Sequence, residues 1–302
     1  MRDMHIVWHM MSRSGTGRGW HHAVRIMFGA CVVGFLWLGV GDPVAAASRP
    51  SPEAARTWQR QTELLDRTLK GLQPAVPGQP HLYFVGFAGY GPQEVFKREV
   101  LAVRKFFDAR YGTEGRSIAL VNHASTLAAL PLASTGNLER TLQHLGKLMD
   151  PSRDVLFLFL TSHGEDGLFV VEMPRFDLKP LRPAQLKDML KRSGIKNSVI
   201  VLSACHSGSF LPALADPTTL VIAAARADRS SFGCDDRRQW TYFGEAYFQR
   251  ALRAEPSFVR AFELARELIA RWEAQAKLEP SLPQIGGGET LGPALAAIRP
   301  HH

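Results

Sequence analysis

Residues 155–160 read Val-Leu-Phe-Leu-Phe-Leu, an unbroken apolar run of strand length. A second apolar run, Val199–Leu202, follows further along the chain. A half-buried strand alternates apolar and polar residues, whereas an unbroken apolar strand is buried on both faces, as in a parallel sheet. The two runs therefore predict a parallel sheet that is covered by helices on both faces.

Outward from these runs, short apolar segments alternate with amphipathic segments. Leucines from Leu138 to Leu148 mark one helix, with Asn137 as its expected N-cap. Further strands are expected at 81–87, 117–121 and 220–225, and further helices at 92–110, 183–193, 243–254 and 256–277. The alternation is typical of a doubly wound α/β fold, in which right-handed crossovers place helices on both faces of the sheet.

The first residues have the pattern of an export signal. Four arginines precede an apolar run from Ile26 to Val40, and a small-residue stretch ends at Ala47. Because a membrane-spanning helix needs about 20 apolar residues, we expect residues 1–47 to be a cleaved signal peptide, the alternative being a membrane anchor. With either outcome the rest of the chain is expected outside the cytoplasm, periplasmic or secreted. Residues 48–80 are then expected to form an N-terminal helix and a linker, and residues 81–302 one domain.

Composition excludes some functions. The chain has 302 residues, of which 45% are hydrophobic and 21% are charged, as in ordinary globular proteins. Its formal net charge is +8, from 36 Lys and Arg against 28 Asp and Glu. The basic residues are scattered and form no stripe interleaved with aromatic residues, so no nucleic-acid partner is expected.

Polar residues that can perform chemistry follow the two apolar runs. His163 and Gly164 come shortly after the first run, and Cys205 shortly after the second. In open parallel sheets, ligands bind beyond the carboxyl ends of the strands, so neighbouring strands would bring His163 and Cys205 into one crevice. A thiolate is a nucleophile, and an imidazole can transfer its proton at neutral pH. Small residues at both places let the Gly164 and Cys205 amides approach a carbonyl oxygen as an oxyanion hole.

Three other interpretations remain open at this point. Cys205 can be a small core residue. It can form a disulfide with Cys234, since both would face an oxidising compartment. A zinc site built from His163, Cys205, His206 and Cys234 is the third possibility, although the chain lacks the close pairing of ligands that zinc motifs show.

The sequence also resembles a known family in three segments. Residues 161–164 (Thr-Ser-His-Gly) and 203–209 (Ser-Ala-Cys-His-Ser-Gly-Ser) are similar to the His-Gly and Glu-Ala-Cys-Glu-Ser-Gly-Ser motifs of the legumain family of cysteine peptidases. Residues 221–234, which end in Ser-Ser-Phe-Gly-Cys, and 241–245 resemble a later strand, turn and Thr-Tyr-Leu-Gly-Asp run of that family. The family includes asparaginyl endopeptidases and the catalytic subunit of the GPI transamidase, and it has the caspase-like fold.

The resemblance implies a caspase-like three-layer α/β sandwich with a mostly parallel sheet. It implies Cys205 and His163 as a catalytic dyad, with the amides of Gly164 and Cys205 as oxyanion donors. The expected function is that of an exported cysteine endopeptidase that works through an acyl-enzyme, without a cofactor, on peptide or protein substrates. The alternatives are a transpeptidase or transamidase with the same dyad, and a non-catalytic binding scaffold. A homodimer is possible, and contact with a membrane is expected only if the leader stays uncleaved.

The specificity pocket departs from the family pattern. Ser203 stands where legumains have a Glu, and Pro92 or Gln93 stands where some members have an Asn that orients the His. We expect the pocket to be lined by Ser203 and by a further set of polar residues: Glu94, Ser230, Ser231, and Asp235 or Asp236. Acidic walls would favour a Lys or Arg side chain of the substrate. The alternative is that the two aspartates lie in a solvated loop, paired with Arg237 and Arg238.

Overall fold

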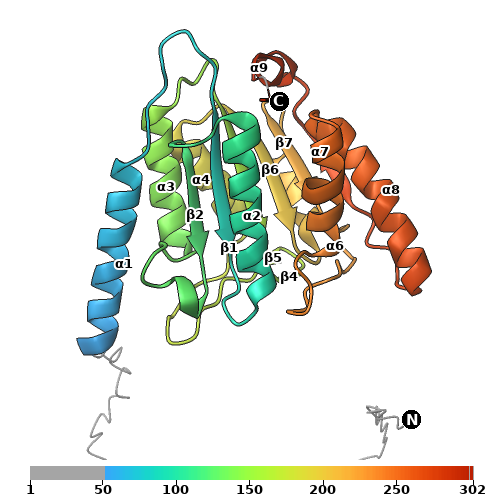
Figure 1. Ribbon diagram of the computed structural model, residues 1–302, viewed down its shortest axis with the longest axis horizontal. Helices are drawn as coiled ribbons and strands as arrows, with labels where there is room; N and C mark the ends of the chain where they lie inside the picture. Colours follow the sequence, from blue (N-terminus) through green and yellow to red (C-terminus); the bar gives the residue numbers. More distant parts are fainter. Residues whose placement is uncertain (1–51, 299, 302) are drawn as a thin grey trace, which may run out of the picture. The chain divides into compact units, whose positions relative to one another are not determined.

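The computed structural model describes residues 52–298 together with residues 300 and 301 (Figure 1). The expected export signal at residues 1–47 and its Cys31 lie outside the described residues. Within the described part, no helix has the length and apolar character needed to cross a membrane.

Six strands form one sheet in the order β2-β1-β3-β6-β7-β8. Neighbouring strands run parallel from β2 to β7, and β8 is antiparallel to β7. The strands are β1 (Leu82–Ala88), β2 (Ser117–Val121), β3 (Val155–Thr161), β6 (Asn197–Ser203), β7 (Thr219–Ala223) and β8 (Gln284–Gly286). Strands β3 and β6, which contain the two apolar runs, are direct neighbours, and the last residue of β3, Thr161, pairs with the last residue of β6, Ser203.

Helices cover both faces of the sheet, with a separate apolar core on each side. One face packs against α2 (Glu94–Tyr111), the π-helical segment η3 (Glu245–Ala251) with its flanking turns α6 (Tyr242–Gly244) and α7 (Leu252–Ala254), and α8 (Phe258–Ala276). The other face packs against α1 (Pro52–Lys70), α3 (Thr135–Leu148), α4 (Pro183–Ser193) and α5 (Leu211–Leu214). The expected three-layer α/β sandwich with a mostly parallel sheet is therefore confirmed.

Helix α1 is part of this packing. Its Leu65 and Leu69 are buried in the same core as α3 and β1. The Gln61 carboxamide donates to the Leu127 carbonyl at 2.7 Å and accepts from the Leu132 amide at 2.8 Å. The helix expected from the sequence is thus stabilised by contacts with the residues that follow it.

Small elements differ from the expectations. The N-cap of α3 is Ser134, whose hydroxyl accepts from the Asn137 amide at 3.0 Å, so the assignment of the cap to Asn137 was wrong. The hairpin β4 (Gly164–Glu165) and β5 (Leu168–Phe169), and strand β8, were not foreseen. Strands of two or three residues are too short to show a periodic pattern. The hairpin lies near the carboxyl ends of the strands, at the lower edge of the sheet in Figure 1, where the expected site also lies.

Candidate active site

His163 lies two residues beyond the end of β3, in a half-buried aromatic setting. Its ring makes edge contacts with Tyr90, at 4.6 Å between ring centroids, and with Phe96, at 5.2 Å. Its backbone carbonyl accepts from the Val170 amide at 3.0 Å, which ties the residue to the β4–β5 hairpin. Packing and the backbone therefore fix the position of the imidazole.

Gln93, the N-cap residue of α2, fixes the orientation of that ring. Its side-chain Nε2 donates to the Cys234 carbonyl at 2.9 Å, so its Oε1 faces His163 Nε2 at 2.6 Å. Since the amide oxygen only accepts, Nε2 of a neutral His163 carries the hydrogen and Nδ1 keeps the lone pair. The hydrogen-bond network thus assigns the tautomer in which Nδ1 can take up a proton.

The protonation of His163 follows from its surroundings. Burial lowers its pKa below the ordinary value of 6.5, and the negative charge of Glu172 raises it by a smaller amount. The ring is therefore neutral at pH 7, as a proton acceptor must be.

Cys205 lies two residues beyond the end of β6, in a tight turn. The next residue, His206, adopts the left-handed region with φ 55°, and the turn η2 (Ser207–Phe210) follows it. The ring atom Nδ1 of His206 lies 2.9 Å from the Ala227 carbonyl, and the backbone amide of His206 donates to the Arg229 carbonyl at 2.8 Å. These contacts hold the turn against the segment that follows β7.

The two strand ends touch each other. The Ser162 amide donates to the Ser203 carbonyl at 3.2 Å. A Cβ atom at Gly164 would collide with the Cys205 carbonyl oxygen, so only glycine allows the backbone to approach this closely. The thiol of Cys205 bonds to the backbone of Ser231, accepting from its amide at 3.3 Å and facing its carbonyl at 3.4 Å. Within the described residues, the imidazole of His163 bonds to Gln93 and the thiol of Cys205 bonds to the Ser231 backbone, and no hydrogen bond joins the two side chains.

Both described cysteines are free. Cys234 is partly buried, and this burial, together with Cys205 and Glu99 nearby, raises the pKa of its thiol to about 12. Cys234 is therefore a poor nucleophile at neutral pH. Because both cysteines are free, the structure does not contain the alternative disulfide between Cys205 and Cys234. In the part of the chain that the structure describes, no group of three or more His, Cys, Asp and Glu side chains could hold a metal ion.

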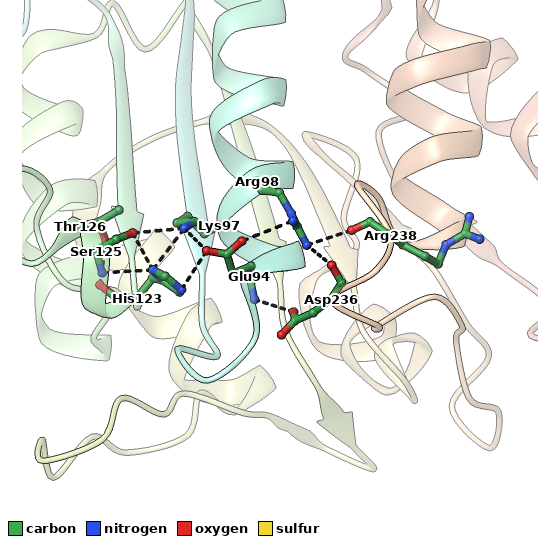
Figure 2. A network of polar contacts seen from close by, with 8 residues as sticks. All are labelled: Glu94, Lys97, Arg98, His123, Ser125, Thr126, Asp236 and Arg238. Atoms are coloured by element: carbon green, nitrogen blue, oxygen red, sulfur yellow. Dashed lines mark hydrogen bonds and ion pairs between the residues drawn. The ribbon is translucent and has the colours of Figure 1, made fainter.

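Two residues of the expected pocket, Glu94 and Asp236, meet at the start of α2 (Figure 2). The Asp236 carboxylate accepts from the Glu94 amide at 2.7 Å. The Glu94 carboxylate accepts from Lys97 at 2.9 Å and pairs with Arg98 at 3.3 Å. The hydrogen bond from Lys97 is the main reason that the pKa of Glu94 lies below its ordinary value. The negative charge of Glu94 is thus balanced by two cations on its own helix.

The other expected pocket residues have different surroundings. Ser231 contacts the thiol, as described, and Ser230 is exposed. Asp235 pairs with Arg237, as in the alternative of a charged surface loop. Ser203, another residue of the expected pocket, is only 2% exposed, and its hydroxyl lies 3.2 Å from Thr241 Oγ1. As the buried last residue of β6, it faces the interior.

Comparison with known sequences identifies the family. The sequence pattern described as "Peptidase C13 family" matches residues 133–287, slightly more than half of the chain, including the His163 and Cys205 segments. The chain belongs to the peptidase C13 family. This membership confirms the resemblance to legumains and supports a cysteine-peptidase type of function.

Individual relatives of this C13 family member match over shorter stretches. Legumain from Mus musculus and legumain from Rattus norvegicus are each 30% identical over 97 residues, which is 32% of this chain. The match spans only 22% of the length of each legumain. The crystal structure of caspase-1 from Spodoptera frugiperda is also similar, with a TM-score of 0.45 and 13% identity over 69% of this chain and 86% of that one.

The site of this C13 family member contains one buried residue that the sequence interpretation missed. Glu99 is fully buried in α2 and accepts three hydrogen bonds, two of them from side chains. A signal was present in the sequence: Glu99 interrupts the apolar stripe formed by Val95, Phe96, Val100 and Val103. A carboxylate among the core positions of a helix is rarely buried without a partner.

Proposed function

We propose that the chain is a cysteine endopeptidase that hydrolyses peptide bonds through an acyl-enzyme, with Cys205 as nucleophile and His163 as proton carrier. The observation that carries this proposal is the oriented, neutral imidazole of His163, held by Gln93 at 2.6 Å beside the strand end that bears Cys205. Membership of the C13 family supports the same chemistry.

In the proposed reaction, His163 Nδ1 takes the proton of the Cys205 thiol while the sulfur attacks the peptide carbonyl carbon. The tetrahedral intermediate collapses to a thioester, and the imidazolium gives its proton to the leaving amine. Water then attacks the thioester, His163 takes a proton from it, and the acid product leaves as Cys205 regains its hydrogen. The thiol must first give up its contact with the Ser231 backbone.

The oxyanion of each tetrahedral intermediate would be held by the amides of Gly164 and Cys205. The close approach of Gly164 to the Cys205 carbonyl supports this, because the two amides belong to backbone segments in contact. Preorganised backbone donors stabilise the charge that develops in the transition state.

We propose further that Glu94, Ser230, Ser231, Asp235 and Asp236 lie along the path of the substrate. The link from Gln93 to the Cys234 carbonyl places the loop that contains the two aspartates next to the helix that contains Glu94. We also propose export of the chain, which N-terminal sequencing of the exported protein, with a start at Ser48, would test.

Covalent labelling of the full chain with a peptidyl electrophile, followed by peptide mapping, tests the dyad. We expect an adduct on Cys205, none in Cys205→Ala, and labelling slowed about a hundredfold in His163→Ala, as for loss of a general base. His144→Ala, a change on α3, is the matched control and should label like the unaltered chain. A folded chain in which Cys205 does not react, or reacts equally fast without His163, would refute the dyad and favour a binding scaffold.

A further inference from the structure

Glu99 is a buried carboxylate that the proposed reaction does not use. It lies on α2 with 0% exposure, between the apolar side chains that face the sheet. We propose that Glu99 is a positioning residue, which holds the ends of β3 and β6 in the register that aligns His163 with Cys205. This role rests on the proposed function.

The first link runs to the strand that precedes His163. Thr161, the last residue of β3, donates its hydroxyl hydrogen to Glu99 Oε2 at 2.7 Å. Thr161 is fully buried and lies two residues before His163. A displacement of this strand end would therefore move the imidazole as well.

The second link runs to the strand that precedes Cys205. Glu99 Oε1 accepts from the Thr241 hydroxyl at 2.8 Å and from the Thr241 amide at 3.1 Å. Thr241 Oγ1 in turn lies 3.2 Å from the hydroxyl of Ser203, which is two residues before Cys205. Thr161 and Ser203 are paired residues at the ends of β3 and β6. One carboxylate oxygen of Glu99 bonds to Thr161 directly, and the other is connected to Ser203 through Thr241.

The same helix holds the residue that orients the imidazole. Gln93 caps α2 and bonds to both His163 and the Cys234 carbonyl. The Thr241 contacts also fix the end of the loop that contains Cys234. Glu99 thus links α2, whose N-cap is Gln93, to the strand ends that precede His163 and Cys205.

Stability alone does not explain a carboxylate at this place. Burial raises the pKa of Glu99, and no ion pair of the described residues includes it. An apolar side chain would fill the stripe without the desolvation cost of a carboxylate. What the carboxylate adds is directional bonding, and a fully satisfied buried network specifies a unique arrangement of its parts.

Replacements of Glu99 differ in whether they keep the hydrogen bonds to Thr161 and Thr241. In Glu99→Gln the amide oxygen can still accept from Thr241, and the amide nitrogen can donate to the Thr161 hydroxyl, so both links survive without the charge. In Glu99→Leu both links are lost. Thr161→Val removes only the first link and is nearly isosteric with threonine, so the test remains valid if Glu99→Leu does not fold. Thr161→Ser keeps the hydroxyl that donates to Glu99.

The test is the rate of alkylation of Cys205 by iodoacetamide between pH 6 and 9, followed by peptide mapping of the full chain. The difference between the unaltered chain and His163→Ala defines the His163-dependent rate. We expect Glu99→Leu and Thr161→Val to lower that rate about tenfold at pH 7, as for a small misplacement of catalytic groups. Glu99→Gln and Thr161→Ser should stay within about twofold of the unaltered chain, because their links persist.

The matched control is Thr141→Val on α3. Thr141 is also fully buried, and its hydroxyl makes one hydrogen bond, to the Asn137 carbonyl at 2.8 Å. We expect this variant to lose thermal stability like Thr161→Val but to keep the alkylation profile of the unaltered chain.

Three other results of the alkylation experiment would each refute either the role of Glu99 or the proposed dyad. A His163-dependent rate that persists in Glu99→Leu or Thr161→Val would refute the role of Glu99 and leave the proposed dyad intact. A loss in Glu99→Gln as large as in Glu99→Leu would show that charge matters, and would also refute positioning. A rate that is independent of His163 in the unaltered chain would refute the proposed function itself.

Discussion

At the scale of single residues, Gln93 determines which nitrogen of His163 can accept a proton. We expect Gln93→Leu to lower kcat about a hundredfold, because the Nε2 hydrogen loses its acceptor and the other tautomer becomes favourable. Gln93→Asn should recover part of the loss, since a shorter amide can reach the ring with a small shift. Equal kcat in Gln93→Leu and the unaltered chain, measured on one peptide substrate, would contradict the assigned tautomer.

The pKa of His163 gives a second prediction at this scale. The charge of Glu172 raises that pKa, so Glu172→Gln should lower it further. Because the proposed reaction needs neutral His163, the acid limb of the kcat/KM profile should move to lower pH. Glu165→Gln, which removes an exposed carboxylate from β4, is the control. A limb that moves to higher pH would contradict the assignment of that limb to His163.

Glu94 gives a prediction about selectivity. Its charge is balanced by Lys97 and Arg98, so Glu94→Gln leaves these cations without their partner. The ratio of cleavage after Lys or Arg to cleavage after neutral residues should then fall several-fold. An unchanged ratio on a defined peptide mixture would show that Glu94 does not line the substrate path.

At the scale of elements, the contact between the β4–β5 hairpin and the Cys205 turn depends on Gly164. A methyl group at Gly164 would collide with the Cys205 carbonyl. Gly164→Ala should therefore destabilise the fold by about 1–3 kcal/mol, as overpacking does. The same variant should reduce the rate of alkylation of Cys205. Gly136→Ala is the matched control, because nothing lies near a Cβ at that position of α3. If both variants behave alike in denaturant unfolding and labelling, the close approach has no role.

The elements also show what the sequence could predict. The apolar runs of β3 and β6 were recognisable because buried parallel strands need no alternation, and their ends correctly indicated where His163 and Cys205 lie. The hairpin and β8 are too short for a pattern. The link between Glu99 and the two strand ends was missed because it joins residues far apart in sequence, although the lone carboxylate on an apolar stripe was visible. The burial of Ser203 was not predictable, since local sequence does not report which face of a strand end is covered.

At the scale of the whole molecule, helix α1 stabilises the domain. Leu65 is fully buried in the core that α1 shares with α3 and β1. We expect Leu65→Ala to lower the free energy of unfolding by about 2–5 kcal/mol, as for other large-to-small core changes. Leu264→Ala, on the exposed side of α8, should cost less than about 0.5 kcal/mol. Equal unfolding midpoints for the two variants would mean that α1 is not part of the cooperative fold.

Cleavage of a diverse peptide mixture by the whole chain tests the proposed activity most directly. The full chain and its Cys205→Ala variant are incubated with the mixture, and the new peptide ends are identified by mass spectrometry. The proposed dyad predicts cuts that appear only when Cys205 is present, with the residues before the cuts defining selectivity. If an amine is added to the mixture and is found joined to the new carboxyl ends in place of water, the chain is a transpeptidase. Identical peptide mixtures from both proteins, each shown to be folded, would contradict the claim that this C13 family member is a cysteine peptidase.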